Sequence, residues 1–299
     1  MSAVLSVQRA GPLTTIQDLG RHGMLRSGIS ASGPMDRRAY ELAGTVVGAG
    51  LGGIEITAAG AEFKVTSGEC LVGFAGGHFT VRVNGRVADW PGTSALEVGD
   101  VLAITPGSSG NYGYLRFDAD IDIAPVLGSI ATNSRVRLGG LDGRALRTGD
   151  VVALTGHGRS AREARQPPTG QDGPFRVVWG LHADAFPSAI KDHFLRAEFV
   201  VSTRLDRMGV RLTDGSGVFS DATILSLVSD AVTPGDIQIL GDGTPIVLMR
   251  DHQPTGGYPR IATIITADLD RFAQMRPGST VAFQPVTVEH AHHVLRSGP

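Results

Sequence analysis

The feature that most constrains this chain is a long succession of short apolar runs separated by turn residues. From residue 54 to about residue 155, runs rich in Val, Ile, Phe and Tyr alternate with turns such as Asn84-Gly85 and Asp142-Gly143. Short β-branched runs are typical of strands, and Asn-Gly and Asp-Gly are typical of tight turns between them. Glycine makes up 41 of the 299 residues, roughly twice its usual share. The sequence therefore predicts a mainly β protein.

The expected elements continue to the C-terminus, with only a few short helices among them. Strands are predicted at residues 4–7, 54–57, 63–65, 70–74, 79–83, 101–105, 112–117, 151–154, 175–179, 199–202, 246–249, 261–265 and 281–283. Helices are predicted after Pro34, with Ser32 or Gly33 as the cap, and at residues 188–195 and 266–274, the last as a capped helix with acidic residues in its first turn.

A linker is predicted at residues 161–174, where large apolar side chains are few and Pro and Gly are frequent. It separates an N-terminal domain at residues 1–160 from a C-terminal domain at residues 175–299. Because both parts consist of short strands with few helices, we expect two β-barrel-like domains.

Composition excludes several classes of function. The formal net charge is −2, so bulk attraction to nucleic acid or to an anionic membrane is not expected. No apolar run approaches the roughly 20 residues that span a bilayer. The single cysteine, Cys70, lies in an apolar run, as expected of a small core residue in a reducing compartment. With no apparent signal peptide, a cytoplasmic location is expected.

Two familiar patterns are interpreted as structural. Residues 48–53 satisfy GxGxxG, but they end a predicted helix and precede a strand, whereas a dinucleotide site needs the opposite order. The segment Glu289–His293 has metal-ligand residue types but lies near the C-terminus, where a solvent-exposed tail is expected. No metal site is predicted.

A Gly-Asp turn recurs three times in similar surroundings. Residues 96–105 are echoed by residues 146–155 and more loosely by residues 233–239. We interpret the echo as a repeated turn between paired strands.

The strongest candidate site lies between the apolar runs at residues 246–249 and 261–265. Polar side chains are dense there, and Gly256-Gly257 gives the backbone freedom for a tight loop. The polar residues are Asp251, His252, Gln253, Thr255 and Tyr258. A dense polar group at the end of an apolar strand is typical of a binding site. The structural alternative is a polar hairpin loop.

Two other stretches combine turn glycines with polar side chains: residues 14–21 with 32–36, and residues 206–212. Arg21, Arg207 and Arg211 are candidate anion binders, because a guanidinium fork matches carboxylate or phosphate. The alternative is a structural Asp–Arg pair, Asp18–Arg21 or Asp206–Arg207, that locks a turn.

These stretches together resemble one family. The motifs are Gly11–Arg21, Ser32–Asp36, Leu127–Ser129, Asp206–Gly209, Ile237–Gln238 and Thr255–Pro259. In this order they are similar to the biotin-dependent carboxyltransferase family that includes the 5-oxoprolinase C-subunit and proteins labelled allophanate hydrolase subunit 2. The resemblance covers about residues 4 to 290.

The resemblance implies a fold, a partner and an activity. It implies two β-barrel domains, the second cyclophilin-like, and a complex with a small protein of the 5-oxoprolinase B-subunit or allophanate hydrolase subunit 1 type. With a third, lactam-hydrolase subunit, such a complex hydrolyses 5-oxoproline to glutamate using ATP. Whether ATP contacts this chain is left open, since the sequence has no standard phosphate loop.

Two alternative functions remain open at this point. One is the carboxyltransferase component of a urea carboxylase system, with biotin on a separate carrier. The other is a non-catalytic protein that antagonises a kinase-inhibitor partner.

The expected site residues follow from the three stretches. Asp251, Gln253 and Thr255 are predicted as catalytic groups for a small amide or lactam, with Asp251 as acceptor or base. Residues predicted to bind substrate are Arg207, Gly256, Gly257, Tyr258, Arg21, Gln17 and Asp18. The chain departs from the family pattern at Gly44, Ala49, Ala119, Asp120, Ala131 and Pro254.

Overall fold

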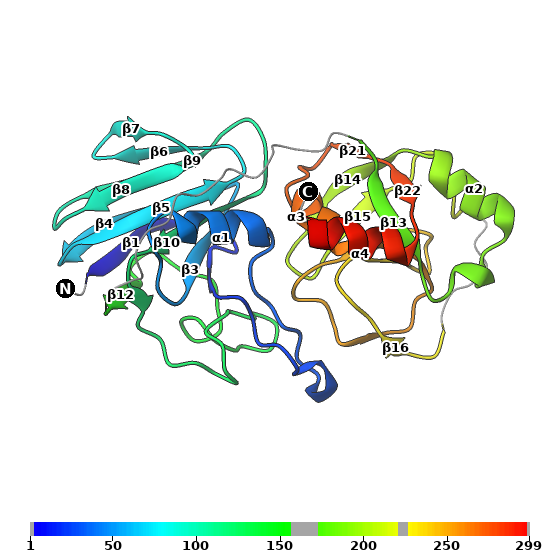
Figure 1. Ribbon diagram of the computed structural model, residues 1–299, viewed down its shortest axis with the longest axis horizontal. Helices are drawn as coiled ribbons and strands as arrows, with labels where there is room; N and C mark the ends of the chain where they lie inside the picture. Colours follow the sequence, from blue (N-terminus) through cyan, green and yellow to red (C-terminus); the bar gives the residue numbers. More distant parts are fainter. Residues whose placement is uncertain (1–2, 157–172, 221–226, 298–299) are drawn as a thin grey trace. The chain divides into compact units, whose positions relative to one another are not determined.

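The computed structural model describes residues 3–156, 173–220 and 227–297. In these ranges the chain is mainly β with four short α-helices, which confirms the predicted fold class (Figure 1). It divides into two compact units, residues 1–22 with 31–166 and residues 23–30 with 167–299. The linker predicted at residues 161–174 falls largely outside the described residues, so the predicted domain limits stay a prediction.

The first unit consists of two antiparallel sheets. One has the order β11 (Asp120–Ile121), β12 (Val151–Thr155), β1 (Val4–Ala10), β4 (Ala61–Ser67), β9 (Val101–Pro106), β6 (Phe79–Val83) and β7 (Arg86–Ala88). The other has the order β2 (Thr15–Gln17), β3 (Gly53–Thr57), β10 (Tyr112–Phe117), β5 (Cys70–Gly76) and β8 (Gly92–Leu96). Strands β2, β7, β8 and β11 are short elements that the hydrophobic pattern did not predict.

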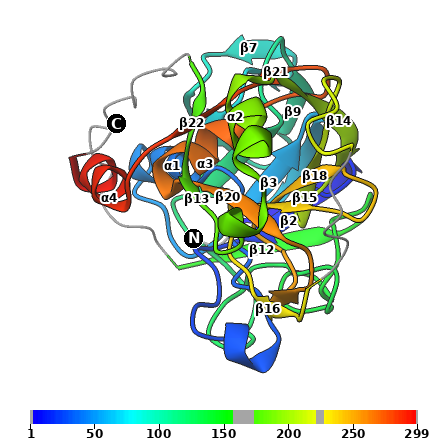
Figure 2. The ribbon, with the colours of Figure 1, turned by 90° about the vertical axis from the view of Figure 1, so that its right-hand side faces the viewer.

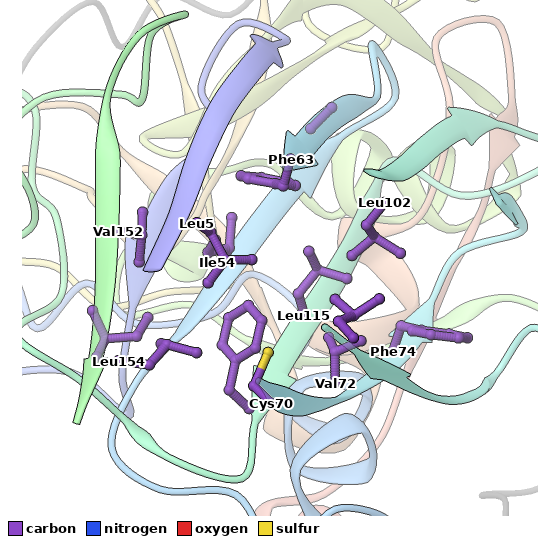
Figure 3. Close-up of a cluster of buried hydrophobic side chains, with 14 of the residues drawn as sticks. Leu5, Ile54, Phe63, Cys70, Val72, Phe74, Leu102, Leu115, Val152 and Leu154 are labelled. Atoms are coloured by element: carbon purple, nitrogen blue, oxygen red, sulfur yellow. The ribbon is translucent and has the colours of Figure 1, made fainter. Parts of the chain in front are cut away.

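Alternating side chains of the two sheets form one core. In β4, for example, Ala61, Phe63 and Val65 are buried while the residues between them are not. Figure 3 shows the cluster, in which Leu5, Phe63 and Leu115 come from different strands. Cys70 lies in this core, as predicted, and burial together with nearby Asp118 raises the pKa of its thiol to about 12. It is therefore a packing residue.

The helix predicted after Pro34 begins later than expected. Helix α1 spans Arg37–Thr45, and its N-cap is Asp36, whose side chain accepts a hydrogen bond from the backbone N–H of Ala39. Ser32 is not the cap, because its backbone has a left-handed φ of 59°. Asp36 is the extended residue directly before the helix, and its carboxylate accepts a hydrogen bond from the first turn, which the Pro34 side chain cannot do.

The second unit is built around one eight-stranded sheet. Its order is β21 (Thr280–Val281), β14 (Phe199–Leu205), β15 (Gly209–Thr213), β18 (Pro245–Leu248), β17 (Asp236–Ile239), β20 (Arg260–Ile264), β13 (Phe175–Trp179) and β22 (Phe283–Pro285). Strands β21 and β22 are at opposite edges, yet only Ala282 separates them in the chain. Residues 280–285 therefore join the two edges, and the sheet closes into a barrel. The likeness to cyclophilin stays a prediction.

Short helices accompany this barrel: η1 (Leu25–Ser27), η2 (Ala183–Ala185), α2 (Ser188–Arg196), α3 (Thr266–Ala273) and α4 (Val288–Ser297). The prediction of a capped α3 was wrong in one respect, because its N-cap is Ile265 and no side chain caps it. The C-terminal segment, expected to be a solvent-exposed tail, is a helix with no buried residue, and it lies beside α3 (Figures 1 and 2). None of the helices in the described residues is long and apolar enough to cross a membrane.

The recurring Gly-Asp turn is confirmed as a structural device. Asp100, Asp150 and Asp236 each accept a hydrogen bond from the backbone N–H three residues earlier. The glycine before each aspartate has a positive φ of 91–98°. Only glycine adopts this conformation without strain, so the turn imposes the same residue pair each time.

Candidate functional site

The candidate loop joins two strands that are not neighbours. It leaves β18 and enters β20, and β17 lies between them in the sheet. The hairpin alternative is therefore wrong. Because the loop crosses the end of β17, it brings residues 251–258 over side chains of that strand.

The base of the loop is a buried ion pair. Arg207 Nε donates to Asp251 Oδ2 at 2.9 Å, and Nη2 donates to Oδ1 at 3.2 Å. Both side chains are only 3% exposed. The Asp251 backbone N–H also donates to the Arg207 carbonyl at 2.7 Å. Arg207 thus pairs with Asp251, while the Asp206 carboxylate accepts the backbone N–H groups of Met208 and Gly209.

This pairing limits what Arg207 binds by itself. A fork already occupied by one carboxylate presents little net charge to a second anion. An anionic ligand would have to displace Asp251 or approach another edge of the guanidinium. The prediction that Arg207 binds substrate remains a prediction.

The tip of the loop is held by a small ribbon. β19 (Thr255–Gly256) pairs with β16 (Asp230–Ala231), and the Leu227 N–H donates to the Gly257 carbonyl at 2.6 Å. A Cβ on Gly256 would lie 2.4 Å from Gln238 Nε2, and one on Gly257 would lie 2.9 Å from the Leu227 carbonyl oxygen. The glycine pair is therefore required by close packing under and beside the loop.

The polar side chains at the tip differ in exposure. Thr255 is exposed, Gln253 is half-buried and Tyr258 is 39% exposed. Gln253 Nε2 donates to Gln238 Oε1 at 3.4 Å. Of the seven site residues predicted in this unit, six lie on this loop and the seventh, Arg207, pairs with the loop residue Asp251. Among their polar side chains, Thr255 and Tyr258 are exposed and Gln253 is partly exposed.

His252 is buried in the same loop and was not predicted as a site residue. Its Nδ1 lies 2.6 Å from the Gln253 carbonyl oxygen, and the side chain is 4% exposed. A carbonyl accepts only, so Nδ1 carries the proton. Burial lowers the pKa of His252, and nearby Asp236 and Asp251 oppose this shift. The ring is therefore neutral at neutral pH.

Gln238 and Arg260 are two buried polar residues next to the loop and its ribbon that were not predicted as site residues. Gln238 is 1% exposed on β17, and Arg260 is 7% exposed on β20. Arg260 donates to Asp230, Asp236 and the Ala231 carbonyl, so it links the ribbon to the barrel. The available signal was a pair of polar residues, Asp236 and Gln238, alternating with isoleucines in a buried strand.

In the first unit, Asp18 and Arg21 bind the loop at residues 126–131. Asp18 accepts the Ser129 hydroxyl at 2.6 Å and the Ile130 N–H at 2.8 Å. Arg21, 1% exposed, donates to the carbonyls of Ser129 at 3.2 Å and Ala131 at 2.7 Å. These contacts lock two loops together.

Gln17 is held in the same way. Its Nε2 donates to Thr15 Oγ1 and to the Thr132 carbonyl, and its Oε1 accepts the Gly33 N–H. Gln17 is fully buried. The contacts of Gln17, Asp18 and Arg21 are structural, and their prediction as substrate-binding residues remains a prediction.

One departure from the family pattern has a local compensation. A Cβ on Gly44 would lie 2.9 Å from Nη1 of Arg116. Arg116 donates to the Gly52 and Gly50 carbonyls and stacks on the Tyr40 ring at 4.1 Å. The guanidinium thus fills the space where a side chain at position 44 would lie.

Comparisons with known proteins agree on one family. Residues 27–285 match the family model "Carboxyltransferase domain, subdomain A and B". The chain is 36% identical to the 5-oxoprolinase C-subunit of Escherichia coli K12, covering 96% of this chain and 93% of that protein. It is 30% identical to the protein of the same name from Haemophilus influenzae, covering 94% and 91%.

Two further similarities are to parts of larger proteins. Urea amidolyase of Lachancea kluyveri is 28% identical over 97% of this chain, which spans 17% of that protein. The crystal structure of Kluyveromyces lactis urea amidolyase superposes with a TM-score of 0.87 at 25% identity, over 98% of this chain and 19% of that one. With a match across residues 27–285 and relatives similar over nearly their whole length, the chain belongs to the carboxyltransferase domain A and B family.

Proposed function

We propose that the chain is one component of a 5-oxoprolinase-type complex, which hydrolyses 5-oxoproline to glutamate at the expense of ATP. The observation that carries this proposal is the 36% identity to a full-length relative named as the C-subunit of 5-oxoprolinase. Its partners in this proposal are a small protein of the B-subunit type and a third, lactam-hydrolase subunit. The chain has one cysteine, which cannot form an internal disulfide and suits a reducing compartment, and this supports a cytoplasmic complex.

The proposed site is the loop at residues 251–258. Gln253 and Thr255 donate toward the carbonyl of a small amide or lactam, together with the backbone of Gly256 and Gly257. Their exposure supports this role, since a ligand reaches them without rearranging the core. Asp251 acts as acceptor for the substrate N–H or as base, which requires that Arg207 loosen its hold.

The roles of the first-unit residues are indirect in this proposal. Gln17, Asp18 and Arg21 fix the loops on which they lie, because their polar atoms bond main-chain groups. ATP is used by the complex as a whole, and no standard phosphate-binding loop occurs in this sequence.

The test is a reconstituted complex. The chain is co-expressed with its small partner protein, the lactam-hydrolase subunit is added, and ATP-dependent 5-oxoproline consumption is measured. Thr255→Val and Gln253→Met alter exposed or half-buried side chains, so they are expected to lower kcat/KM about tenfold or more without unfolding the chain. Thr213→Val, an exposed threonine on β15, is the matched control.

Two outcomes would contradict the proposal. A folded wild-type complex that leaves 5-oxoproline intact would contradict the proposed activity. An active complex in which Thr255→Val and Gln253→Met match the control would show that the loop is not the active site.

A second function is favoured by the similarity to urea amidolyases across nearly the whole chain. In this case the chain is a carboxyltransferase component that moves a carboxyl group from carboxybiotin, held by a separate carrier, to urea. The test is transfer of labelled carboxylate from a carboxylated biotin carrier to urea in the presence of the chain and its small partner. Label that stays on the carrier would reject this function.

A further inference from the structure

Two buried nitrogen donors of the barrel, on neighbouring residues, have no hydrogen-bond partner within the described part of the chain. They are Gln238 Nε2 and Arg260 Nε. Gln238 on β17 and Arg260 on β20 are directly paired across the two antiparallel strands. Directly opposite residues project from the same face of a sheet, with Cβ atoms about 5 Å apart. The two side chains therefore lie next to each other on one face.

The rest of both side chains is already fixed. Gln238 Oε1 accepts from Gln253 Nε2, which orients the amide so that its Nε2 faces Gly256. Arg260 Nη1 donates to the Ala231 carbonyl at 2.8 Å and to Asp236 at 3.2 Å, and Nη2 donates to Asp230 at 3.0 Å. With these groups held, the two remaining nitrogens are preorganised donors.

The charge around the pair selects the kind of acceptor. Arg260 contacts two carboxylates, Asp230 and Asp236, so the cluster carries a formal charge of −1. A carboxylate or phosphate oxygen placed at the two nitrogens would be repelled, so the carboxylate of a ligand such as 5-oxoproline has to point away from them. A neutral carbonyl oxygen accepts two hydrogen bonds without adding charge, so an amide carbonyl is the acceptor that fits.

The pair lies directly under the loop proposed as the site. A Cβ on Gly256 would be 2.4 Å from Gln238 Nε2 and 3.3 Å from Val232 Cγ1. Gly256 belongs to β19, which pairs with β16 through only two residue pairs. Because both nitrogens are closed to solvent, a ligand would reach them only if the Thr255–Gly256 strand shifted.

We propose that Gln238 Nε2 and Arg260 Nε bind the amide carbonyl oxygen of the substrate and so determine specificity for a small amide or lactam. This inference rests on the proposed function, because it concerns the same loop and the same substrate. Gln253, which donates to Gln238 Oε1, lies on the same side of the loop as this donor pair.

The first test uses the wild-type chain in its complex with the small partner protein. Glutamine is labelled with ¹⁵N, and the Gln238 side-chain amide resonance is identified by its loss in Gln238→Met. We expect 5-oxoproline to shift this resonance saturably. Proline, which has the same ring and carboxylate but no ring carbonyl, is expected to leave it in place. An equal shift with proline, or none with either 5-oxoproline or urea, would overturn the proposal.

The second test is kinetic. In the full complex, Gln238→Met and Arg260→Lys are each expected to lower kcat/KM for 5-oxoproline about tenfold. Gln238→Met removes the Nε2 donor, and Arg260→Lys removes the Nε donor while keeping a positive charge for Asp230 and Asp236. The controls are Gln284→Met and Arg204→Lys, exposed residues on strands of the same sheet, expected to stay within twofold of the wild type.

The outcomes separate this inference from the proposed function. If the wild-type complex does not consume 5-oxoproline but urea shifts the Gln238 resonance, the donor pair is supported and the 5-oxoproline activity is not. If the complex is active and folded Gln238→Met and Arg260→Lys match their controls, the donor pair is wrong.

Discussion

At the scale of single residues, the Arg207–Asp251 pair decides how the candidate loop begins. Both side chains are nearly inaccessible, and the attraction between their opposite charges offsets the cost of burying them. The pair therefore gives the loop a defined starting geometry rather than a free charge for binding.

Removing one partner should expose this dependence. Asp251→Ala removes the buried carboxylate that accepts from Arg207 Nε and Nη2, so the free energy of unfolding is expected to fall by about 3–5 kcal/mol. Arg37→Ala breaks the ion pair between Arg37 and Glu41, whose two side chains are about half exposed. This substitution should change the free energy of unfolding by less than about 1 kcal/mol. Urea unfolding monitored by circular dichroism measures both, and equal losses in the two variants would contradict this account.

His252 should make stability depend on pH. Burial lowers its pKa, so between the folded value and the unfolded value near 6.5 the unfolded chain binds more protons. The contribution of the neutral His252 ring to stability is therefore fully present above about pH 6.5, and it is lost as the pH falls from there through the folded pKa. The fall in melting temperature from pH 7.5 to pH 5 should be smaller in His252→Gln than in the wild type. The exposed His22→Gln should match the wild type, and a His252→Gln profile identical to it would refute the assignment.

At the scale of elements, the start of α1 shows how a cap fixes the limits of a helix. Pro34 and Ser32 suggest an earlier start, but the backbone of residues 32 and 33 is left-handed in the structure. The helix begins only where the Asp36 carboxylate meets a free backbone N–H. Local propensity indicates that a helix is present, and the cap decides where it begins.

This cap should be measurable by substitution. Asp36→Ala removes the acceptor of the Ala39 N–H and is expected to lower the free energy of unfolding by about 1 kcal/mol. Asp36→Asn keeps a side-chain oxygen and should retain most of the stability. Denaturant midpoints compare the two, and an Asn variant as unstable as the Ala variant would assign the loss to other contacts of Asp36.

At the scale of the whole molecule, closure of the second unit depends on a segment of six residues. Residues 280–285 pair with β14 through β21 and with β13 through β22, so they satisfy both edges of one sheet. Phe283 also stacks on Phe194 with ring centroids 5.0 Å apart. Without this segment the barrel has two open edges and an exposed aromatic core.

Two truncations distinguish the contribution of barrel closure to stability from the contribution of α4. Deleting residues 288–299 removes α4, which has no buried residue, and should leave cooperative unfolding in place with a modest fall in melting temperature. Deleting residues 280–299 opens both edges and is expected to abolish cooperative unfolding of the second unit. Calorimetry of both forms tests this, and similar traces would show that the segment is not needed for closure.

The local features of this protein follow from its amino-acid sequence alone. Short apolar runs predicted β4 and β13, Asn84-Gly85 predicted the turn after β6, and the Gly-Asp pairs predicted three similar turns. The sequence also indicated that residues 251–258 are a polar loop after a buried strand. These signals are local because they depend on backbone conformation and on the period of side-chain burial.

Which residues meet depends instead on the three-dimensional fold. The sequence offered Asp206 and Asp18 as partners for nearby arginines, but Arg207 pairs with Asp251, and Arg21 bonds carbonyls more than 100 residues away. Likewise, Gln238 and Arg260 become a donor pair because β17 lies between β18 and β20. Strand order depends on long-range pairing and on closure of the barrel, and no short window of sequence contains that information.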